Sequence, residues 1–263
     1  VHPLHDLEVV GLVATLGALA VVFWSHQLWQ VEDWRTPLSW HQGGDALFNV
    51  LLAQNIEETG WYQENPRLGA PKGLKLYDWP GSVLVPMAGV KLLGIFLDSP
   101  GAIVNLYYLL GWPLAAIAAL WAFLRLGISP PLATGLALTF AALPAHAMRG
   151  EPHLFLASLA FIPPAIVVAY ELARNGLTLR GRVWALAFAL ILGACEAYYG
   201  FFASFLVFAG AIIGWFAGGG WRRILDALAF GLAAAAGVLA AILPSLLYGE
   251  VATVARTASA ASV

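Results

Sequence analysis

Charged side chains are scarce in this sequence. Asp, Glu, Lys and Arg make up only 11% of its 263 residues, whereas 60% are hydrophobic. A soluble domain normally carries about 25% charged residues, so too few are present here to cover a surface that faces water. The apolar surface must therefore face lipid, and the composition predicts an integral membrane protein.

Cysteine and basic clusters are scarce as well. The single cysteine, Cys195, cannot form an internal disulfide, and no CxxC, HExxH or Cys/His zinc spacing occurs. The formal net charge is −2. No basic cluster is dense enough to neutralise a row of phosphodiesters, which excludes nucleic acid as a partner and leaves membrane lipid.

Long apolar segments are abundant, and about 20 such residues are enough to cross a bilayer. The expected spans are the first helix, within 1–29, and then 101–124, 128–147, 153–173, 183–197, 198–217 and 225–248. The stretch 183–217 is too long for one span, so we place a turn at Glu196. The predicted fold is an all-α integral membrane bundle of about seven transmembrane helices, with a large outer loop after the first.

The distribution of charge predicts which way the helices face. Short loops rich in arginine stay on the cytoplasmic side, and the loops near Arg125, Arg180 and Arg222 are of this kind. The acidic residues near the membrane collect on the opposite side, at Asp45, Asp78, Glu151, Glu196 and Glu250. We therefore expect a bacterial inner-membrane protein whose first loop faces the periplasm.

With this orientation the apolar segment 82–97 begins and ends on the outer side. We interpret it as a re-entrant or interfacial segment, in which Lys91 reaches the interface or an anionic headgroup. The alternative, in which 82–97 crosses the membrane, breaks the charge rule at every later loop.

The expected organisation has four parts. They are a first transmembrane helix (1–29), an outer loop (30–98), a helix bundle (99–250) and the start of a further loop (251–263). The last part indicates that the chain belongs to a longer polypeptide.

Two segments of the outer loop have a recognisable pattern. Residues 45–59 have apolar side chains at helical spacing, with Gly60 as a stop, and predict an amphipathic helix that lies on the membrane. Residues 65–80 carry Pro and Gly at close intervals and predict an ordered or semi-ordered loop.

Candidate catalytic residues are carboxylates on the outer side. Asp45 suits a helix N-cap, and it equally suits a base that accepts a proton from an attacking hydroxyl. Glu151 suits an ion pair with Arg149 in a turn, or a second acid. Asp45, Glu151 and His153 together are also candidates for holding a divalent cation, although their spacing is not diagnostic.

The remaining candidates would contact substrate. The full set is Lys72, Lys75, Asp78, Arg149, His153, Glu196, Tyr198 and Tyr199. Lysine, arginine and histidine suit a phosphate. The tyrosines beside Glu196 suit a sugar-binding wall, or alternatively an aromatic belt at a helix end.

The order of these motifs carries a resemblance. Asp45 lies just past the first span, a Trp-Pro pair at 79–80 leads into an apolar hairpin, and Asn105 follows the run 99–102. Over roughly residues 8–200 the chain resembles the N-terminal half of the GT-C superfamily of membrane glycosyltransferases. Protein O-mannosyltransferases and lipid A aminoarabinose transferases share this order, and uncharacterised bacterial membrane proteins share the Gly-Asp, Trp-Pro and Gly-x-Pro-His series.

The resemblance implies a polyprenyl-phosphate-linked sugar as co-substrate and transfer on the outer face. It maps the general base to Asp45 and the second-loop acid to Glu151. The chain has Asp45-Ala46 where the mannosyltransferases have a paired Asp-Glu, and Asp78-Trp79-Pro80 where they have His-Pro-Pro. These departures leave the acceptor open.

Two other classes of function remain open. The chain could be a non-catalytic subunit of a larger membrane complex, in which Asp45 only caps a helix. A transporter or flippase is the other alternative, and it would require polar residues at mid-membrane and broken helices related by symmetry.

Overall fold

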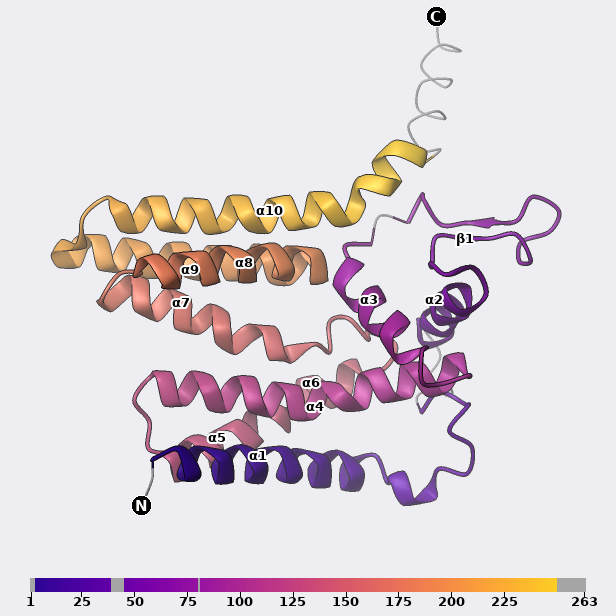
Figure 1. Ribbon diagram of the computed structural model, residues 1–263, viewed down its shortest axis with the longest axis horizontal. Helices are drawn as coiled ribbons and strands as arrows, with labels where there is room; N and C mark the ends of the chain where they lie inside the picture. Colours follow the sequence, from indigo (N-terminus) through magenta and orange to yellow (C-terminus); the bar gives the residue numbers. More distant parts are fainter. Residues whose placement is uncertain (1–2, 39–44, 80, 250–263) are drawn as a thin grey trace, which may run out of the picture.

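The computed structural model describes residues 3–38, 45–79 and 81–249, with side chains described from residue 8 onward. The described chain is mostly helical (Figure 1). Five of its helical stretches are long and apolar enough to cross a membrane: Glu8–Ser25, Pro100–Arg125, Pro130–Arg149, Ala197–Gly219 and Arg222–Tyr248. The prediction of a helical membrane protein is confirmed at this level. The glycines before Asp45, Pro80, Glu250 and the expected further loop lie outside the described residues.

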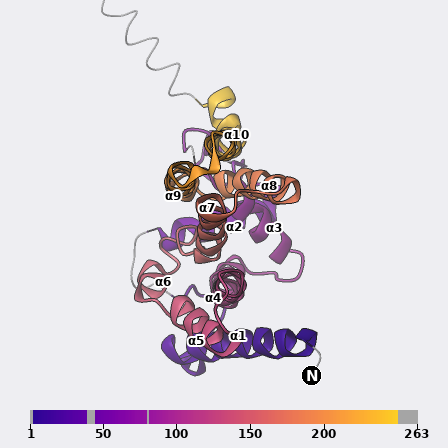
Figure 2. The same cartoon turned by 90° about the vertical axis from the view of Figure 1, so that its left-hand side faces the viewer.

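The long helices lie roughly side by side, from α1 at the bottom of Figure 1 to α10 at the top. They are α1 (Pro3–Ser25), α4 (Pro100–Arg125), α5 (Pro130–Ala141), α7 (Ile162–Arg174), α8 (Leu179–Cys195), α9 (Ala197–Gly214) and α10 (Arg222–Tyr248). Shorter pieces are α6 (Pro144–Arg149), the 3₁₀ turns η1 (Leu28–Gln30) and η3 (Leu159–Phe161), and the π turn η4 (Trp215–Gly219). Seen end-on, α7 lies between α4 and the group formed by α8, α9 and α10 (Figure 2).

Two predicted spans differ from the helices observed. The segment 153–173 is α-helical only from Ile162, because 150–157 forms turns and the 3₁₀ turn η3 precedes the helix. Pro163 suits a first helical turn, where its missing N–H is not needed. The segment 128–147 is interrupted between α5 and α6 just before Pro144. With 13 and 17 residues, α7 and α8 rise about 20 and 26 Å, less than the roughly 30 Å of a hydrocarbon core.

The two ends of the bundle differ in charge. Arg125 and Arg174 end α4 and α7, and Arg222 begins α10. The loops after α4, after α7 and before α10 lie together at the left of Figure 1. At the opposite end, α8 and α9 meet at Glu196, next to the outer elements α2 and α3. The predicted separation of arginines from acids is only partial, because Arg125 pairs with Glu171 and Arg182 with Asp226 at the arginine end.

The elements between η1 and α4 form a small layer across one end of the bundle. They are α2 (Ala46–Thr59), α3 (Leu84–Leu93), and the strands β1 (Glu64–Asn65) and β2 (Leu74–Lys75), which pair antiparallel. The strand pair is a minor exception to the predicted all-α class. With 10 residues, α3 rises about 15 Å, half of a hydrocarbon core. Lys91 donates a hydrogen bond from Nζ to the carbonyl of Gly60 at 2.9 Å, so it links α3 to the end of α2.

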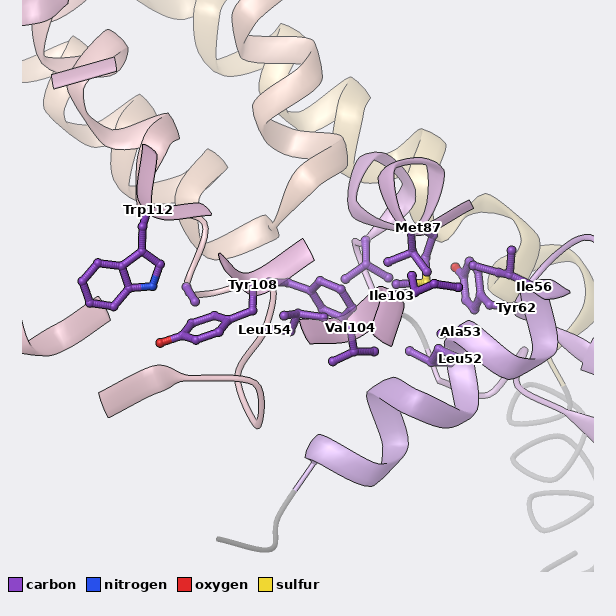
Figure 3. Packing of buried hydrophobic residues seen from close by; sticks show 14 of the residues in the cluster. Leu52, Ala53, Ile56, Tyr62, Met87, Ile103, Val104, Tyr108, Trp112 and Leu154 are labelled. Carbon is purple, nitrogen blue, oxygen red and sulfur yellow. The ribbon is translucent and has the colours of Figure 1, made fainter. Parts of the chain in front are cut away.

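The apolar face of α2 packs against protein. Leu52 and Ala53 are fully buried, in one cluster with Met87, Ile103 and Val104 (Figure 3). Leu47, on another face, is 56% exposed. The expected amphipathic helix exists, but its apolar stripe packs against the N-terminal end of α4 and completes the core there instead of resting on lipid.

Asn105 fastens the first part of the outer loop to α4. This fully buried side chain accepts a hydrogen bond from the amide of Leu38 at 3.0 Å and donates to the carbonyls of Trp34 and Thr36, both at 2.9 Å. A Cβ on Gly101 would lie 1.8 Å from the carbonyl oxygen of Arg35, so the close packing of this loop on α4 requires glycine at position 101. The sequence motif around Asn105 therefore has a structural role.

Replacing Asn105 by leucine should release this loop. The substitution keeps the volume but leaves one amide and two carbonyls without partners, and each such buried group costs about 1–3 kcal/mol. We expect the melting temperature in detergent to fall by at least roughly 6 °C and trypsin to cleave faster at Arg35. Asn175→Leu, at an exposed helix end, is the matched control. Equal melting and proteolysis of Asn105→Leu and wild type would contradict this role.

Candidate functional site

A cavity of about 360 Å³ opens at the acidic end of the bundle. Four separate segments supply its walls, with these lining residues: Asp45, Phe48, Asn49, Trp79, Pro152, His153, Leu154, Phe155, Leu156 and Glu196. Asp45, His153 and Glu196, three of the residues predicted from the sequence, thus line one space. Aromatic rings from Phe48 and Trp79, 5.0 Å apart and edge to face, form one wall.

Asp45 occupies the N-cap position of α2 but does not cap it. Its side chain makes no cap hydrogen bond, and the helix starts with the backbone bond from the amide of Asn49 to the carbonyl of Asp45, at 2.9 Å. The side chain is exposed and lines the cavity. The capping interpretation of Asp45 is therefore wrong, because the carboxylate makes no hydrogen bond to the first turn and stays accessible to a ligand.

Glu196 is a single extended residue between two helices. Its φ of −165° and ψ of 124° break the chain between α8 and α9, which places the predicted turn at one residue. Burial raises the pKa of this carboxyl, and backbone hydrogen bonds from Tyr198 and Ala197 partly oppose the rise. A carboxyl of this kind suits proton exchange or hydrogen bonding to a sugar hydroxyl better than a fully solvated one.

Two hydrogen bonds between distant segments hold the cavity wall in place. The side-chain amide of Asn49 donates to the carbonyl of Glu151 at 2.7 Å, which ties α2 to the turn after α6. The hydroxyl of Tyr199 donates to the carbonyl of Leu156. Tyr199 therefore supports the wall from α9, whereas its neighbour Tyr198 is 63% exposed and does not line the cavity.

The structure separates the residues of the predicted second site. Glu151 is fully buried, whereas Arg149 is exposed and His153 faces the cavity. Among the described residues no three His, Cys, Asp or Glu side chains gather closely enough to hold a metal ion. The predicted cation set of Asp45, Glu151 and His153 is thus not formed, since one member lies in the core and the other two lie at the surface.

A second polar cavity contains the predicted lysines. It measures about 660 Å³ and is lined by Glu64, Gly69, Lys72, Gly73, Leu74, Lys75, Tyr77, Asp78 and Tyr248. Lys72, Lys75 and Asp78 therefore line one space at and just after the β1–β2 ribbon, and none of them lines the cavity of Asp45. Burial and a hydrogen bond to Glu64 raise the pKa of the Tyr77 phenol, so this hydroxyl stays protonated.

An apolar groove of about 750 Å³ runs along α4. Its lining extends from Tyr107 to Trp121 on α4, a rise of about 21 Å, and includes residues of α3 and α7. Leu154 lines both the groove and the cavity of Asp45. The apolar groove and the polar cavity therefore lie on either side of Leu154. Sequence periodicity could not reveal this groove, because its walls come from helices far apart in the chain.

A buried polar cluster that the sequence did not suggest lies beneath the outer layer. His26 Nε2 and the Tyr108 hydroxyl share a hydrogen bond of 2.9 Å, and the His26 ring meets Trp112 edge to face. His146, fully buried, stacks on Trp112 at 4.4 Å and bonds through Nδ1 to the carbonyl of Ala141 at 3.0 Å. Figure 3 shows Tyr108 and Trp112 at the end of the cluster shared with α2. These residues join α1, α4 and α6.

The His26 interaction predicts a pH dependence of stability. Burial holds the pKa of His26 below its ordinary value of 6.5. The unfolded chain therefore takes up a proton before the folded chain does, so stability is present above pH 6.5 and falls as the pH drops below it. We expect the melting temperature to fall by roughly 1–3 °C between pH 7 and pH 5.5. His26→Gln should show a smaller fall over this window, and an unchanged pH slope in the variant would refute the assignment.

Comparisons of the chain with protein-family models, with curated proteins and with solved structures gave no match. The function is therefore argued from the geometry of the site.

Proposed function

We propose that this chain is a membrane glycosyltransferase of the GT-C type, which moves a sugar from a polyprenyl-phosphate donor to an acceptor on the outer face of the membrane. The observation that carries the proposal is that Leu154 lines both a cavity with two carboxylates and a long apolar groove, which places the two side by side. A lipid-linked sugar needs both environments, one for its chain and one for its sugar.

The groove suits a long isoprenoid chain. Its rise of about 21 Å along α4 exceeds the roughly 15 Å depth of one leaflet, so it offers more length than an acyl chain of one leaflet uses. Its walls are almost wholly apolar, with Leu110, Leu114 and Ile117 among them. With the chain in this groove, the phosphate would lie at the outer end, near Leu154.

The cavity suits an inverting displacement. Asp45 takes the proton of the acceptor hydroxyl as its oxygen attacks the anomeric carbon, and the bond from that carbon to the phosphate oxygen breaks. The phosphate leaves with the electron pair, and His153 in the cavity wall is placed to stabilise the added charge. Phe48 and Trp79 offer ring faces and edges to the sugar.

The orientation of the protein is part of the proposal. Arginines at one end of the bundle support a cytoplasmic side there, and the cavity then opens toward the outside. In a bacterium this is the periplasmic face of the inner membrane. Seven crossings, with α7 and α8 as short spans, are consistent with the side-by-side helices of Figure 1.

The test measures chain binding and sugar transfer with the purified protein in nanodiscs. A polyprenyl phosphate with a diazirine in its chain should cross-link to α4 between residues 107 and 121, and a panel of radiolabelled polyprenyl-phosphate sugars should include one that is consumed. Ala118→Trp fills the groove, and Leu132→Trp, on the exposed face of α5, is its control. We expect about tenfold less cross-linking in Ala118→Trp alone, a loss of about 1.4 kcal/mol in binding. If Ala118→Trp cross-links as much as wild type and no sugar is consumed, the non-catalytic subunit becomes the better interpretation.

A further inference from the structure

A third cavity, of about 430 Å³, lies at the arginine end of the bundle, opposite the site described above. Its lining residues are Trp121, Arg125, Val167, Val168, Glu171, Leu177, Thr178, Arg180, Gly181 and Trp184. Trp121 and Trp184 also line the apolar groove. The cavity is therefore a polar pocket that continues directly into an apolar surface within the bundle.

The cavity retains a net positive charge. Arg125 makes an ion pair with Glu171 at 3.3 Å, but its side chain is 56% exposed. Arg180, on the first turn of α8, has no ion pair within the part of the chain that the structure describes. Two guanidinium groups thus face one carboxylate, and one positive charge is left over.

Other arginines at this end already have internal partners. Arg182 pairs with Asp226 at 2.7 Å, and Arg223 donates to the carbonyls of Leu172, Ala173 and Arg174 at the end of α7. Arg125 and Arg180 therefore differ from these two, because they line an open space and keep donors that can reach a ligand.

The tryptophans give the cavity an apolar side. The rings of Trp121 and Trp184 lie 5.5 Å apart, and Trp184 stacks on Phe188. Their side chains are 38% and 41% exposed, so an acyl chain can pack along them. Indole rings prefer the headgroup level of a membrane, where one edge is apolar and the other is wet.

We propose that this cavity binds an anionic phospholipid of the leaflet on the arginine side, with its phosphate at Arg125 and Arg180 and one acyl chain along Trp121 and Trp184. Arginine matches phosphate oxygens with a planar pair of donors, and the remaining charge favours a lipid with net charge −1 over a zwitterionic one. This site is at the opposite end of the bundle from the cavity of Asp45 and shares only Trp121 and Trp184 with the apolar groove, so its phosphate site at Arg125 and Arg180 does not depend on the proposed sugar transfer.

Native mass spectrometry of the full chain tests the proposal, with phosphatidylglycerol, phosphatidylcholine and inorganic phosphate as probes. Wild type should retain phosphatidylglycerol at least fivefold better than phosphatidylcholine. Arg180→Gln and Arg125→Gln should each remove most of this preference. Arg222→Gln is the matched control, because it also removes an exposed arginine at this end but does not line the cavity.

Equal retention of the two lipids, an unchanged preference in Arg180→Gln, or full competition by inorganic phosphate would overturn the lipid site. A second measurement tests the site if the arginine variants fail to fold. Brominated phosphatidylglycerol should quench the fluorescence of wild type more than that of Trp184→Phe, because Trp184 lies against the bound chain. Equal fractional quenching in the two proteins would equally overturn the proposal.

Discussion

Gly193→Ala is expected to prevent assembly of the native bundle. A Cβ at this position would lie 1.9 Å from the carbonyl oxygen of Ala234 and 2.8 Å from its carbonyl carbon. Both are backbone atoms of α10, so no side chain can move aside and the two helices must separate. Small residues allow this close approach between helices in membranes. We expect a loss of at least about 3 kcal/mol, at or beyond the upper end of the usual cost of overpacking.

The partner position gives an independent check. A Cβ on Gly237 would lie 2.1 Å from the carbonyl oxygen of Leu190, in the same contact between α8 and α10. Gly237→Ala should therefore fail in the same way, and the double variant should lose less than the sum because both changes push the same helices apart.

Two other glycines serve as matched controls. Gly11 in α1 and Gly135 in α5 have nothing within 4 Å of an added Cβ. Alanine there should be neutral or stabilise by up to about 1 kcal/mol, since alanine forms helices more readily. The measurements are the monodisperse yield in detergent and the melting temperature. A yield and a melting temperature of Gly193→Ala equal to those of wild type would contradict the prediction, because α8 and α10 would then accommodate the added methyl group.

The contact at Gly193 also positions the site. Its carbonyl accepts a hydrogen bond from the hydroxyl of Ser82 at 2.6 Å, which ties the start of α3 to α8. Glu196 follows within one helical turn. Displacement of α8 would therefore move one carboxylate of the cavity relative to Asp45, so stability and the geometry of the site depend on the same helix contact.

Some of this arrangement follows from the sequence. The turn at Glu196 was predictable because an apolar run of that length exceeds one span and contains a single charge. The helix after Asp45 was predictable from spacing and from Gly60, which adopts a φ of 86° at its end. Features of this kind depend on residues that are close in the chain, so they can be predicted from a single sequence.

Contacts between distant segments were not predictable in the same way. Asp45 and Glu151 looked equivalent in sequence, yet one is exposed and the other is fully buried. The lysines at 72 and 75 looked placed for a phosphate at the Asp45 site, but the fold of the β1–β2 ribbon gives them a cavity of their own. His26 and Tyr108 are 82 residues apart and make their hydrogen bond only after α1 and α4 pack together.

Asp45→Asn is expected to lower the rate constant of sugar transfer by about 10²–10⁴-fold, the usual contribution of a general base. Asparagine has nearly the same shape and cannot take the proton of the acceptor hydroxyl. Cross-linking of the polyprenyl probe should stay unchanged, because the groove does not include residue 45. Asp33→Asn is the control, since this outer-loop carboxylate accepts a hydrogen bond from the amide of Arg35 and lies outside the cavity.

Glu196 decides between two assignments of the base, because it is the other carboxylate of the cavity. If Asp45 is the base, Glu196→Gln should act mainly on KM, raising it by about tenfold through a weakened hydrogen bond to the sugar or acceptor, with kcat nearly retained. The raised pKa of Glu196 gives a second signature: the rise in KM at low pH that protonation of this carboxyl causes should be absent in Glu196→Gln, whose KM should be high at every pH. The opposite pattern, with kcat lost in Glu196→Gln and kept in Asp45→Asn, would move the base to the junction of α8 and α9 and leave Asp45 as a binding residue.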